Sequence, residues 1–300
     1  MELRQLRYFV ATAEYMSFSE AARHLFISQS TLSQQIRQLE DELGSPLFKR
    51  DSHTMAMTEA GDRLLPIAKQ TLQDAELCRT QVTDLRESLT GTLNMGVTSS
   101  FCSILSEPMS EFVRTYRDVK LNIIYTHNCD LLEMLRRRQI DFALAFKSEN
   151  TYDDVESHLL FTDRLCAVVS KYHALAERRS VTPEELLPYG IAIPAKGVQG
   201  RSMLDEYLER TRLPFRVRIE SNSVGFLADL LDDTHKLVGM LPGSIVRKHD
   251  KLVAIPVDAP HCEMQACVHV LRDNYVKRSA SVFVKLIRES TTLKLMNMSL

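Results

Sequence analysis

Apolar residues in the first part of the chain recur at the three- and four-residue spacing of amphipathic helices. This pattern predicts three consecutive helices, over residues 2–16, Glu20–Leu25 and Gln29–Leu43. Ser17 or Ser19 can cap the second helix, and Gly44 follows the third, where a left-handed residue commonly ends a helix. Two extended pieces, 46–50 and 55–58, enclose a polar tip, which predicts a hairpin.

A single long helix is predicted from Glu59 to Leu89, where apolar and small side chains recur at alternating spacings of four and three residues. Pro66 lies inside this segment and is expected to kink it or to distort its first turn. The spacing is typical of a coiled-coil seam, so we expect this helix to pair two subunits. The expected seam residues are Leu64, Ala68, Ala75, Val82 and Leu85.

Strands and helices alternate from Gly91 onward, which favours a parallel sheet with helices on both faces. The predicted strands are Thr92–Val97, Leu121–Tyr125, Phe142–Phe146, Leu165–Val169, Ile191–Ile193, Arg216–Glu220, Leu237–Leu241 and Met264–Leu271. The predicted helices are Ile104–Arg117, Asp130–Arg138, Pro183–Leu187, Ser202–Arg212, Val224–Leu231 and Ala280–Thr292. The chain is therefore expected to hold several domains, with a small all-α domain and a long helix before a larger α/β domain.

Charge and composition narrow the classes of function. The chain carries 37 Lys and Arg against 39 Asp and Glu, so it is not a polycation. Its first sixty residues hold six Lys or Arg and eight Asp or Glu, so any DNA binding must depend on a few well-placed cations. The six cysteines are scattered, and neither a secretion signal nor an apolar run of membrane length is evident. These features predict a cytoplasmic protein with free thiols.

The third predicted helix has the residue types of a DNA-reading helix. In a helix-turn-helix the second helix enters the major groove, where Gln pairs with adenine, Arg with guanine, and short hydroxyls with bases or phosphates. The groove-facing candidates are Ser28, Gln29, Ser30, Thr31, Ser33, Gln34 and Arg37, joined on the hairpin by Lys49 and Arg50 as clamps of the flanking backbone. The alternative is an ordinary amphipathic helix with a solvated polar face.

These elements, in this order, resemble the LysR-type transcriptional regulators. The resemblance is nearly continuous over residues 1–65 and lies in Leu6–Phe9, Ser17–Ala22, Ser28–Ile36, Leu39–Gly44, Pro46–Phe48 and Thr58–Gly61. Ser30 stands where many relatives have Pro and Gln34 where many have Arg, which increases the importance of Arg37 and Arg50. The resemblance implies a winged helix-turn-helix in a sequence-specific bacterial regulator, not an enzyme.

The resemblance also implies the organisation of the whole chain. It implies a DNA-binding domain at 1–58, a linker and dimerisation helix at 59–90, and an effector-binding domain at 91–300. The last domain would resemble periplasmic binding proteins, with one α/β lobe at about 91–164 and 269–300 and the other at about 165–268. The implied partners are double-stranded promoter DNA, a small-molecule effector, RNA polymerase, and further copies of the chain in a homodimer or homotetramer.

Ligands of such sheets bind beyond the carboxyl ends of strands, near helix N-termini. Hydroxyls and backbone N–H groups converge there after the first predicted strand and would cradle a small anion such as a carboxylate. By family position, the expected effector-binding residues are Thr98, Ser99, Ser100, Phe101, Thr126, His127, Gln199 and Asn222. The alternative is that the serines only cap the following helix.

Other chemistries find less support in the residues. The segment Val198–Leu208 lacks the cysteines that peroxide sensors of this family use. A second candidate chemistry is metal binding by a group of His and Cys residues, namely His261, Cys262, Cys267 and His269. Their spacing matches no common zinc site. We therefore expect no metal and no cofactor other than the effector, although Cys102 is a candidate thiol sensor. Ser99 and His127 lack a carboxylate partner, so no catalytic residues are expected. The competing class is an enzyme or solute-binding module with a helical N-terminus.

Overall fold

The computed structural model describes residues 1–300 apart from 51–54, 84–88, 148–151, 199, 260–261 and 299–300. The chain forms two compact units, Met1–Leu85 and Arg86–Leu300. Each unit has a hydrophobic core of its own. Among the described residues, no helix is long and apolar enough to cross a membrane.

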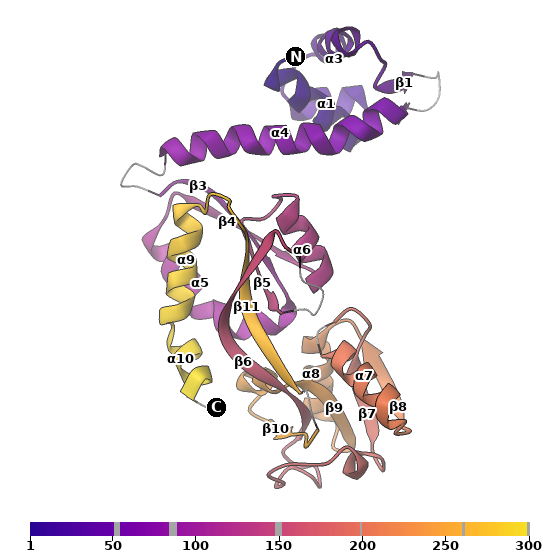
Figure 1. Ribbon diagram of the computed structural model, residues 1–300, viewed down its shortest axis with the longest axis vertical. Coiled ribbons are helices and arrows are strands. Elements are labelled where there is room, and N and C mark those ends of the chain that lie inside the picture. Colours follow the sequence, from indigo (N-terminus) through magenta and orange to yellow (C-terminus); the bar gives the residue numbers. More distant parts are fainter. Residues whose placement is uncertain (51–54, 84–88, 148–151, 199, 260–261, 299–300) are drawn as a thin grey trace. The chain divides into compact units, whose positions relative to one another are not determined.

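The first unit packs its helices around a core that also includes a hairpin (Figure 1). Its elements are α1 (Leu3–Tyr15), α2 (Phe18–His24), α3 (Gln29–Leu43), β1 (Phe48–Arg50), β2 (Met55–Met57) and α4 (Glu59–Thr83). Phe9 on α1 and both Leu32 and Ile36 on α3 are completely buried. The ring of Phe9 lies 5.6 Å from the ring of Phe48, so the hairpin is held by the same core as the helices.

Local signals fix the boundaries of these helices. The Ser17 hydroxyl accepts a hydrogen bond from the N–H of Glu20 at 3.3 Å, and the Ser28 hydroxyl accepts one from the N–H of Thr31 at 3.1 Å. Gly44 ends α3 with a φ of +66°, which glycine adopts without strain. The three predicted helices and the hairpin are confirmed, and the bounds predicted for the third helix are those of α3.

The long helix ends earlier than predicted. Within the described residues α4 is continuous through Pro66 and extends to Thr83, and residues 84–88 lie outside the description. Leu89 lies outside any helix and is buried in the core of the second unit. The prediction of a helix that reaches Leu89 is therefore wrong, because its last apolar residue belongs to a different core.

Two of the five residues of the expected coiled-coil seam pack within their own unit. Ala68 is 1% exposed in the core that α4 shares with α1, and Leu64 packs against the same core. Ala75 is half-buried and Val82 is 65% exposed, whereas Leu85 lies outside the described residues. Among the seam residues that the structure describes, Val82 thus has the side chain most available to a second subunit.

The second unit is built on a sheet of order β4-β3-β5-β11-β6-β9-β7-β8, in which β10 also pairs with β6 (Figure 1). Its strands are β3 (Gly91–Val97), β4 (Val119–Tyr125), β5 (Phe142–Phe146), β6 (Val155–Ser170), β7 (Gly190–Pro194), β8 (Val217–Ser221), β9 (Leu237–Pro242), β10 (Leu252–Pro256) and β11 (Glu263–Leu271). β3, β4 and β5 are parallel, as are β7, β8 and β9. The predicted alternation is confirmed, and parallel pairing is confirmed within these two groups of strands. β6, β10 and β11 pair antiparallel, so the sheet is mixed, and β10 was not predicted.

Two antiparallel strands, β6 and β11, join two α/β lobes. We call β3, β4 and β5 with their helices the first lobe, and β7 to β10 with theirs the second. Residues 155–164 of β6 pair with β11, whereas Leu165–Val168 pair with β9. β11 pairs with β5 from Ala266 onward. The two lobes are therefore connected through one continuous β-sheet, in which β11 and β6 lie between the strands of the two lobes.

The helices of this unit follow the predicted order with two differences. They are α5 (Cys102–Thr115), α6 (Asn128–Arg136), α7 (Arg201–Thr211), α8 (Val224–Asp233), α9 (Arg278–Glu289) and α10 (Thr291–Met298), with short 3-10 turns η1 (Ser99–Phe101), η2 (Glu184–Leu186) and η3 (Gly243–Lys248). The predicted helix Pro183–Leu187 is the turn η2. The predicted helix Ala280–Thr292 is two helices, α9 and α10.

Ser290 causes the break between α9 and α10. Its backbone is extended, its hydroxyl donates to the carbonyl of Ile287 at 2.8 Å, and the same hydroxyl accepts from the N–H of Leu293 at 3.3 Å. Glu107 on α5 accepts hydrogen bonds from the N–H groups of Thr291 and Thr292. The hydrogen bond from the N–H of Thr291 is the main cause of a lowered pKa of the Glu107 carboxyl, and the bond from Thr292 adds to it. α10 is thereby attached to α5.

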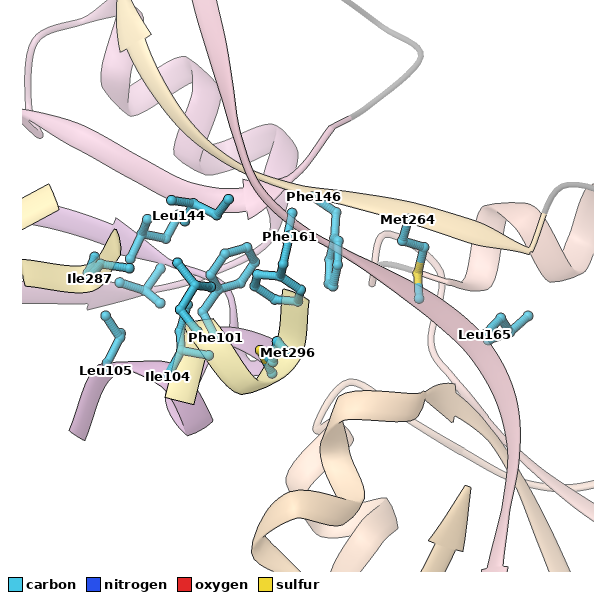
Figure 2. Close-up of a cluster of buried hydrophobic side chains, with 14 of the residues drawn as sticks. Phe101, Ile104, Leu105, Leu144, Phe146, Phe161, Leu165, Met264, Ile287 and Met296 are labelled. Carbon is cyan, nitrogen blue, oxygen red and sulfur yellow. The ribbon is translucent and has the colours of Figure 1, made fainter. Parts of the chain in front are cut away.

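Aromatic rings fill the first lobe where it meets the crossing strands (Figure 2). The ring of Phe101 lies 5.4 Å from Phe146 on β5 and 5.8 Å from Phe161 on β6. All three rings belong to one core that continues into the second lobe through Ile191 and Val238. The end of β3 and the start of α5 are therefore anchored by packing.

Candidate functional site

A cluster of hydroxyl groups surrounds the start of α3. The Ser28 hydroxyl lies 2.7 Å from that of Thr31 and 2.9 Å from that of Ser30. The hydroxyl of Ser19 on α2 donates to the side-chain oxygen of Gln29 at 3.0 Å. Four of the expected reader residues are thus brought together at a helix N-terminus, where unpaired N–H groups and the helix dipole favour an anion such as a phosphate.

The outer face of α3 presents the longer polar side chains. Gln34 and Arg37 are exposed, and Arg37 forms no ion pair with any residue that the structure describes. Ser33 is half-buried and already engaged in an interaction. On the hairpin, Lys49 is exposed and likewise unpaired within the described chain, whereas the side chain of Arg50 is outside the description. Arg37 and Lys49 are therefore available to bind an anionic partner.

The acidic residues near α3 are used by the unit itself. A carboxylate oxygen of Glu40 accepts hydrogen bonds from the N–H groups of Leu47 and Phe48, at 2.8 and 3.3 Å. Glu42 pairs with the N-terminal ammonium of Met1. These contacts hold the hairpin and the N-terminus against the far end of α3. The carboxylates of Glu40 and Glu42 therefore lie at the opposite end of α3 from its hydroxyl groups.

The hairpin packs against the first turn of α4 through Thr58 and Gly61, which belong to one of the segments that resemble the family. The Thr58 hydroxyl donates to the carbonyl of Pro46 at 2.7 Å and accepts from the N–H of Gly61 at 3.1 Å. A side chain at Gly61 would place its first carbon 2.4 Å from the carbonyl oxygen of Leu47. Glycine is required because the backbone of the hairpin touches the helix.

In the second unit, two buried polar atoms lie at the carboxyl end of the first lobe's sheet. Thr98 follows β3 and Asn128 begins α6; both are more than nine-tenths buried. The N–H of Thr98 donates to the carbonyl of Leu144, and the side-chain amide of Asn128 donates to the carbonyl of Phe146. The Thr98 hydroxyl and the Asn128 side-chain oxygen have no hydrogen-bond partner among the described residues.

Such atoms are costly to leave unpaired, so they mark where a ligand would be stabilised. Asn128 was not among the expected effector residues, although its neighbours Thr126 and His127 were. The available signal was its place as the first residue of a helix after a strand, since this position faces the same edge as Thr98. The pattern of polar residues alone does not separate a buried side chain from an exposed one.

The other expected effector residues are distributed unevenly. Ser100 is buried and Ser99 is exposed, both in the turn η1. The Thr126 hydroxyl donates to Asp130, and His127 is half-buried at the cap of α6. Asn222 is exposed between β8 and α8, and Gln199 lies outside the described residues. The ring of Phe101 is fully buried in the aromatic core and supports the turn, and a role of Phe101 in the effector site stays a prediction.

A direct polar contact links the lobes beside this turn. The ammonium of Lys248, at the end of η3, donates to the carbonyl of Cys102 at 3.0 Å. The turn η3 is held to β6 by Asp163, whose carboxylate accepts from the N–H of Ser244 at 3.2 Å. Burial raises the pKa of the Asp163 carboxyl, although the hydrogen bonds from Ser244 and from the N–H of Arg164 act in the opposite direction. The hydrogen bond of Lys248 therefore connects the second lobe to the start of α5.

The alternative chemistries are weakened by the environments of their residues. Burial raises the pKa of both Cys262 and Cys267, which keeps these thiols protonated, and His261 is outside the described residues. Both ring nitrogens of His269 are engaged, one with Ser157 and one with the carbonyl of Ala145. No set of three metal-ligand side chains occurs within the described part of the chain.

The candidate thiol sensor Cys102 has a phenol as its neighbour. Burial, together with the charge and hydrogen bond of Cys102, raises the pKa of Tyr125 to about 12.

Comparison with known proteins agrees with this architecture. Residues 3–62 match the model of the bacterial regulatory helix-turn-helix of the lysR family, and residues 86–292 match the LysR substrate binding domain. The HTH-type transcriptional regulator BsdA of Bacillus subtilis is 35% identical over 171 residues, which cover 54% of this chain and 59% of that protein. The matched region thus spans less than two thirds of that relative.

Two solved structures share the fold along nearly the whole chain. A full-length OxyR variant of Pseudomonas aeruginosa has a TM-score of 0.73 at 23% identity, covering 97% of this chain and 96% of the other. Full-length CbnR, described as complexed with its target DNA, has a TM-score of 0.68 at 17% identity, covering 96% and 99%. At this identity the likeness concerns the fold.

Proposed function

Since the chain belongs to the LysR family of transcriptional regulators, we propose that it binds promoter DNA through its first unit and is controlled by a small molecule bound to its second. The observation that carries this proposal is α3, whose start gathers hydroxyl groups and whose outer face presents an unpaired Arg37. The cytoplasm, where promoter DNA is found, is its place of action. Two or four copies of the chain bind together, and RNA polymerase is the partner that senses the result.

In this proposal the DNA-binding residues of α3 and the hairpin, which we call the reader, make two kinds of contact with DNA. The start of α3 and Lys49 hold phosphates, which positions the unit but carries no sequence information. Gln34 and Arg37 meet base edges, where Arg pairs with guanine and Gln with adenine. Because the reader carries few free cations, a second copy on a neighbouring half-site supplies the remaining affinity.

The division predicts different effects of two substitutions. Arg37→Ala is expected to lower affinity for the chain's upstream DNA roughly tenfold to a hundredfold, with little change on a scrambled duplex. Lys49→Ala is expected to weaken binding to both duplexes equally and to reduce the salt slope by about one. Fluorescence anisotropy over a range of salt concentrations measures both effects.

Lys285→Ala is the matched control, since this exposed lysine pairs with Glu289 in the second unit. Equal behaviour of the two reader variants contradicts the division of roles. Absence of any sequence-specific retardation across the upstream DNA contradicts the regulator itself and favours the competing solute-binding module.

For the effector, we propose a small carboxylate that also carries an O–H or N–H donor. The hydroxyls of Thr98 and Ser100 and the N–H groups of η1 suit a carboxylate, whereas the Asn128 side-chain oxygen accepts a hydrogen bond. Asn222 and Gln199 of the second lobe would complete the site by family position. Closure onto the effector moves η3 and, through Lys248, the start of α5.

Thr98→Val provides the test. The change removes a buried hydroxyl that has no partner among the described residues, so the effector-free protein is expected to gain about 1 kcal/mol of stability. The same change is expected to abolish the rise in melting temperature that an active hydroxy- or amino-carboxylate produces in the wild type.

Thr98→Ser keeps the hydroxyl and is expected to retain the response. Differential scanning fluorimetry with a panel of such acids measures it. An acid that raises the melting temperature of wild type and Thr98→Val equally would remove Thr98 from the site.

A further inference from the structure

Phe26 is the most exposed large apolar side chain of the described residues, at 95%. It lies in the turn between α2 and α3, where its N–H donates to the carbonyl of Arg23 at 3.2 Å. Its φ is +56°, a left-handed conformation that Phe adopts at a cost and Asn or Gly adopts readily. The fold of the first unit thus gains nothing from an aromatic ring here.

The position of this ring relates it to the proposed reader. Phe26 comes two residues before Ser28, whose hydroxyl caps α3 and contacts Ser30 and Thr31. The N–H of Ile27 donates to the carbonyl of Ala22 at 3.0 Å, so the turn is fixed to α2 rather than loose. The ring is therefore held beside the end of α3 that enters the major groove in a helix-turn-helix.

The candidates that face the groove from α3 present hydroxyls, amides and a guanidinium, and the methyl of Thr31 is the one apolar group among them. The major groove presents one apolar group, the C5 methyl of thymine, and Phe is among the side chains that contact it. An exposed ring on a rigid turn can cover that methyl with little loss of conformational entropy.

We propose that Phe26 packs against the C5 methyl of a thymine at the edge of each half-site, and so selects thymine there. The inference rests on the proposed DNA reading and extends it to a residue outside the recognition helix. The strained backbone and the exposed ring are then explained by contact with DNA.

The experiment uses the full chain and duplexes that the wild type selects from a random-sequence pool. Single thymines are replaced by deoxyuridine, which removes only the methyl group. We expect the wild type to lose about fourfold in affinity at one thymine of each half-site, the effect of exposing one methyl. Phe26→Asn is expected to bind the unmodified duplex more weakly and to be insensitive to deoxyuridine at that position. Phe26→Leu, which keeps an apolar side chain, is expected to retain part of the discrimination.

The outcomes separate this inference from the proposed function. If the wild type selects no duplex, the proposed DNA reading fails. If it binds but is indifferent to every deoxyuridine, or if Phe26→Asn loses the same factor as the wild type, only the thymine contact is overturned. A lower melting temperature or a changed oligomeric mass of Phe26→Asn also overturns it, because the ring would then pack against protein.

Discussion

Replacing Gly61 by alanine will destabilise the first unit by about 2–4 kcal/mol, a size expected for an overpacked contact that cannot relax. The added carbon would lie 2.4 Å from the carbonyl oxygen of Leu47 and 3.4 Å from the Cβ of Met57. The oxygen belongs to the backbone, so no rotamer change relieves the clash. Either the hairpin lifts from α4 or the first turn of the helix unwinds, and both movements break the bonds made by Thr58.

Urea denaturation followed by circular dichroism measures this loss, and DNA affinity is expected to fall with it because Lys49 lies on the displaced hairpin. Gly225→Ala is the matched control. Gly225 lies in the first turn of α8, where the nearest atom to an added Cβ is the Ser223 hydroxyl at 4.0 Å. There alanine is expected to stabilise the helix by roughly 0.5–1 kcal/mol. A Gly61→Ala protein as stable as the wild type would show that the hairpin is not seated as described.

Replacing Asp141 by alanine is expected to destabilise the second unit by about 3 kcal/mol. Asp141 precedes β5, and its carboxylate pairs with the ammonium of Lys277 at 2.9 Å and accepts from the N–H of Asn94 at 2.8 Å. Lys277 also donates to the carbonyl of Thr92 at 3.1 Å. The carboxylate thus links β3, β5 and the start of α9. Alanine would leave the largely buried ammonium without its carboxylate partner, so that only the Thr92 carbonyl named above would accept from it, and would leave the N–H of Asn94 without this acceptor.

A double-mutant cycle with Lys277→Met isolates the ion pair from its surroundings. We expect Lys277→Met to cost less than Asp141→Ala, because methionine leaves no buried charge behind. Asp141→Asn keeps one acceptor and is expected to fall between them. Additive losses in the doubly substituted protein would indicate that the two groups do not interact and would contradict the ion pair.

The sequence predicted the first unit more accurately than the second, for a physical reason. Its helices are bounded by local caps such as Ser28 and Gly44, which act over a few residues. The first half of β6 carries mainly exposed side chains, Leu159 among them, so its strand pattern is hidden until β11 pairs with it. β10 is a short apolar run that ends at Pro256, and its partner is also distant in sequence.

The candidate sites show the same limit. The polar face of α3 and the turn after β3 could be located from the order of residues alone. Whether a side chain there is exposed, as Phe26 is, or buried, as Phe101 is, depends on the distant elements that cover it. Ala68 has the spacing of a coiled-coil seam, yet its packing against α1 places it in a core.

The pairing of β5 with β11 also orders events during synthesis. β5 ends at Phe146, but the strand that completes its edge is Glu263–Leu271, so the first lobe cannot finish its sheet until nearly the whole chain has left the ribosome. The first unit, whose core is closed within Met1–Leu85, needs no later residue. A nascent chain therefore holds a folded first unit well before it holds a folded second unit. Under the proposed function, a message truncated in the second unit would yield a fragment that keeps the DNA-binding unit and lacks the effector-binding one.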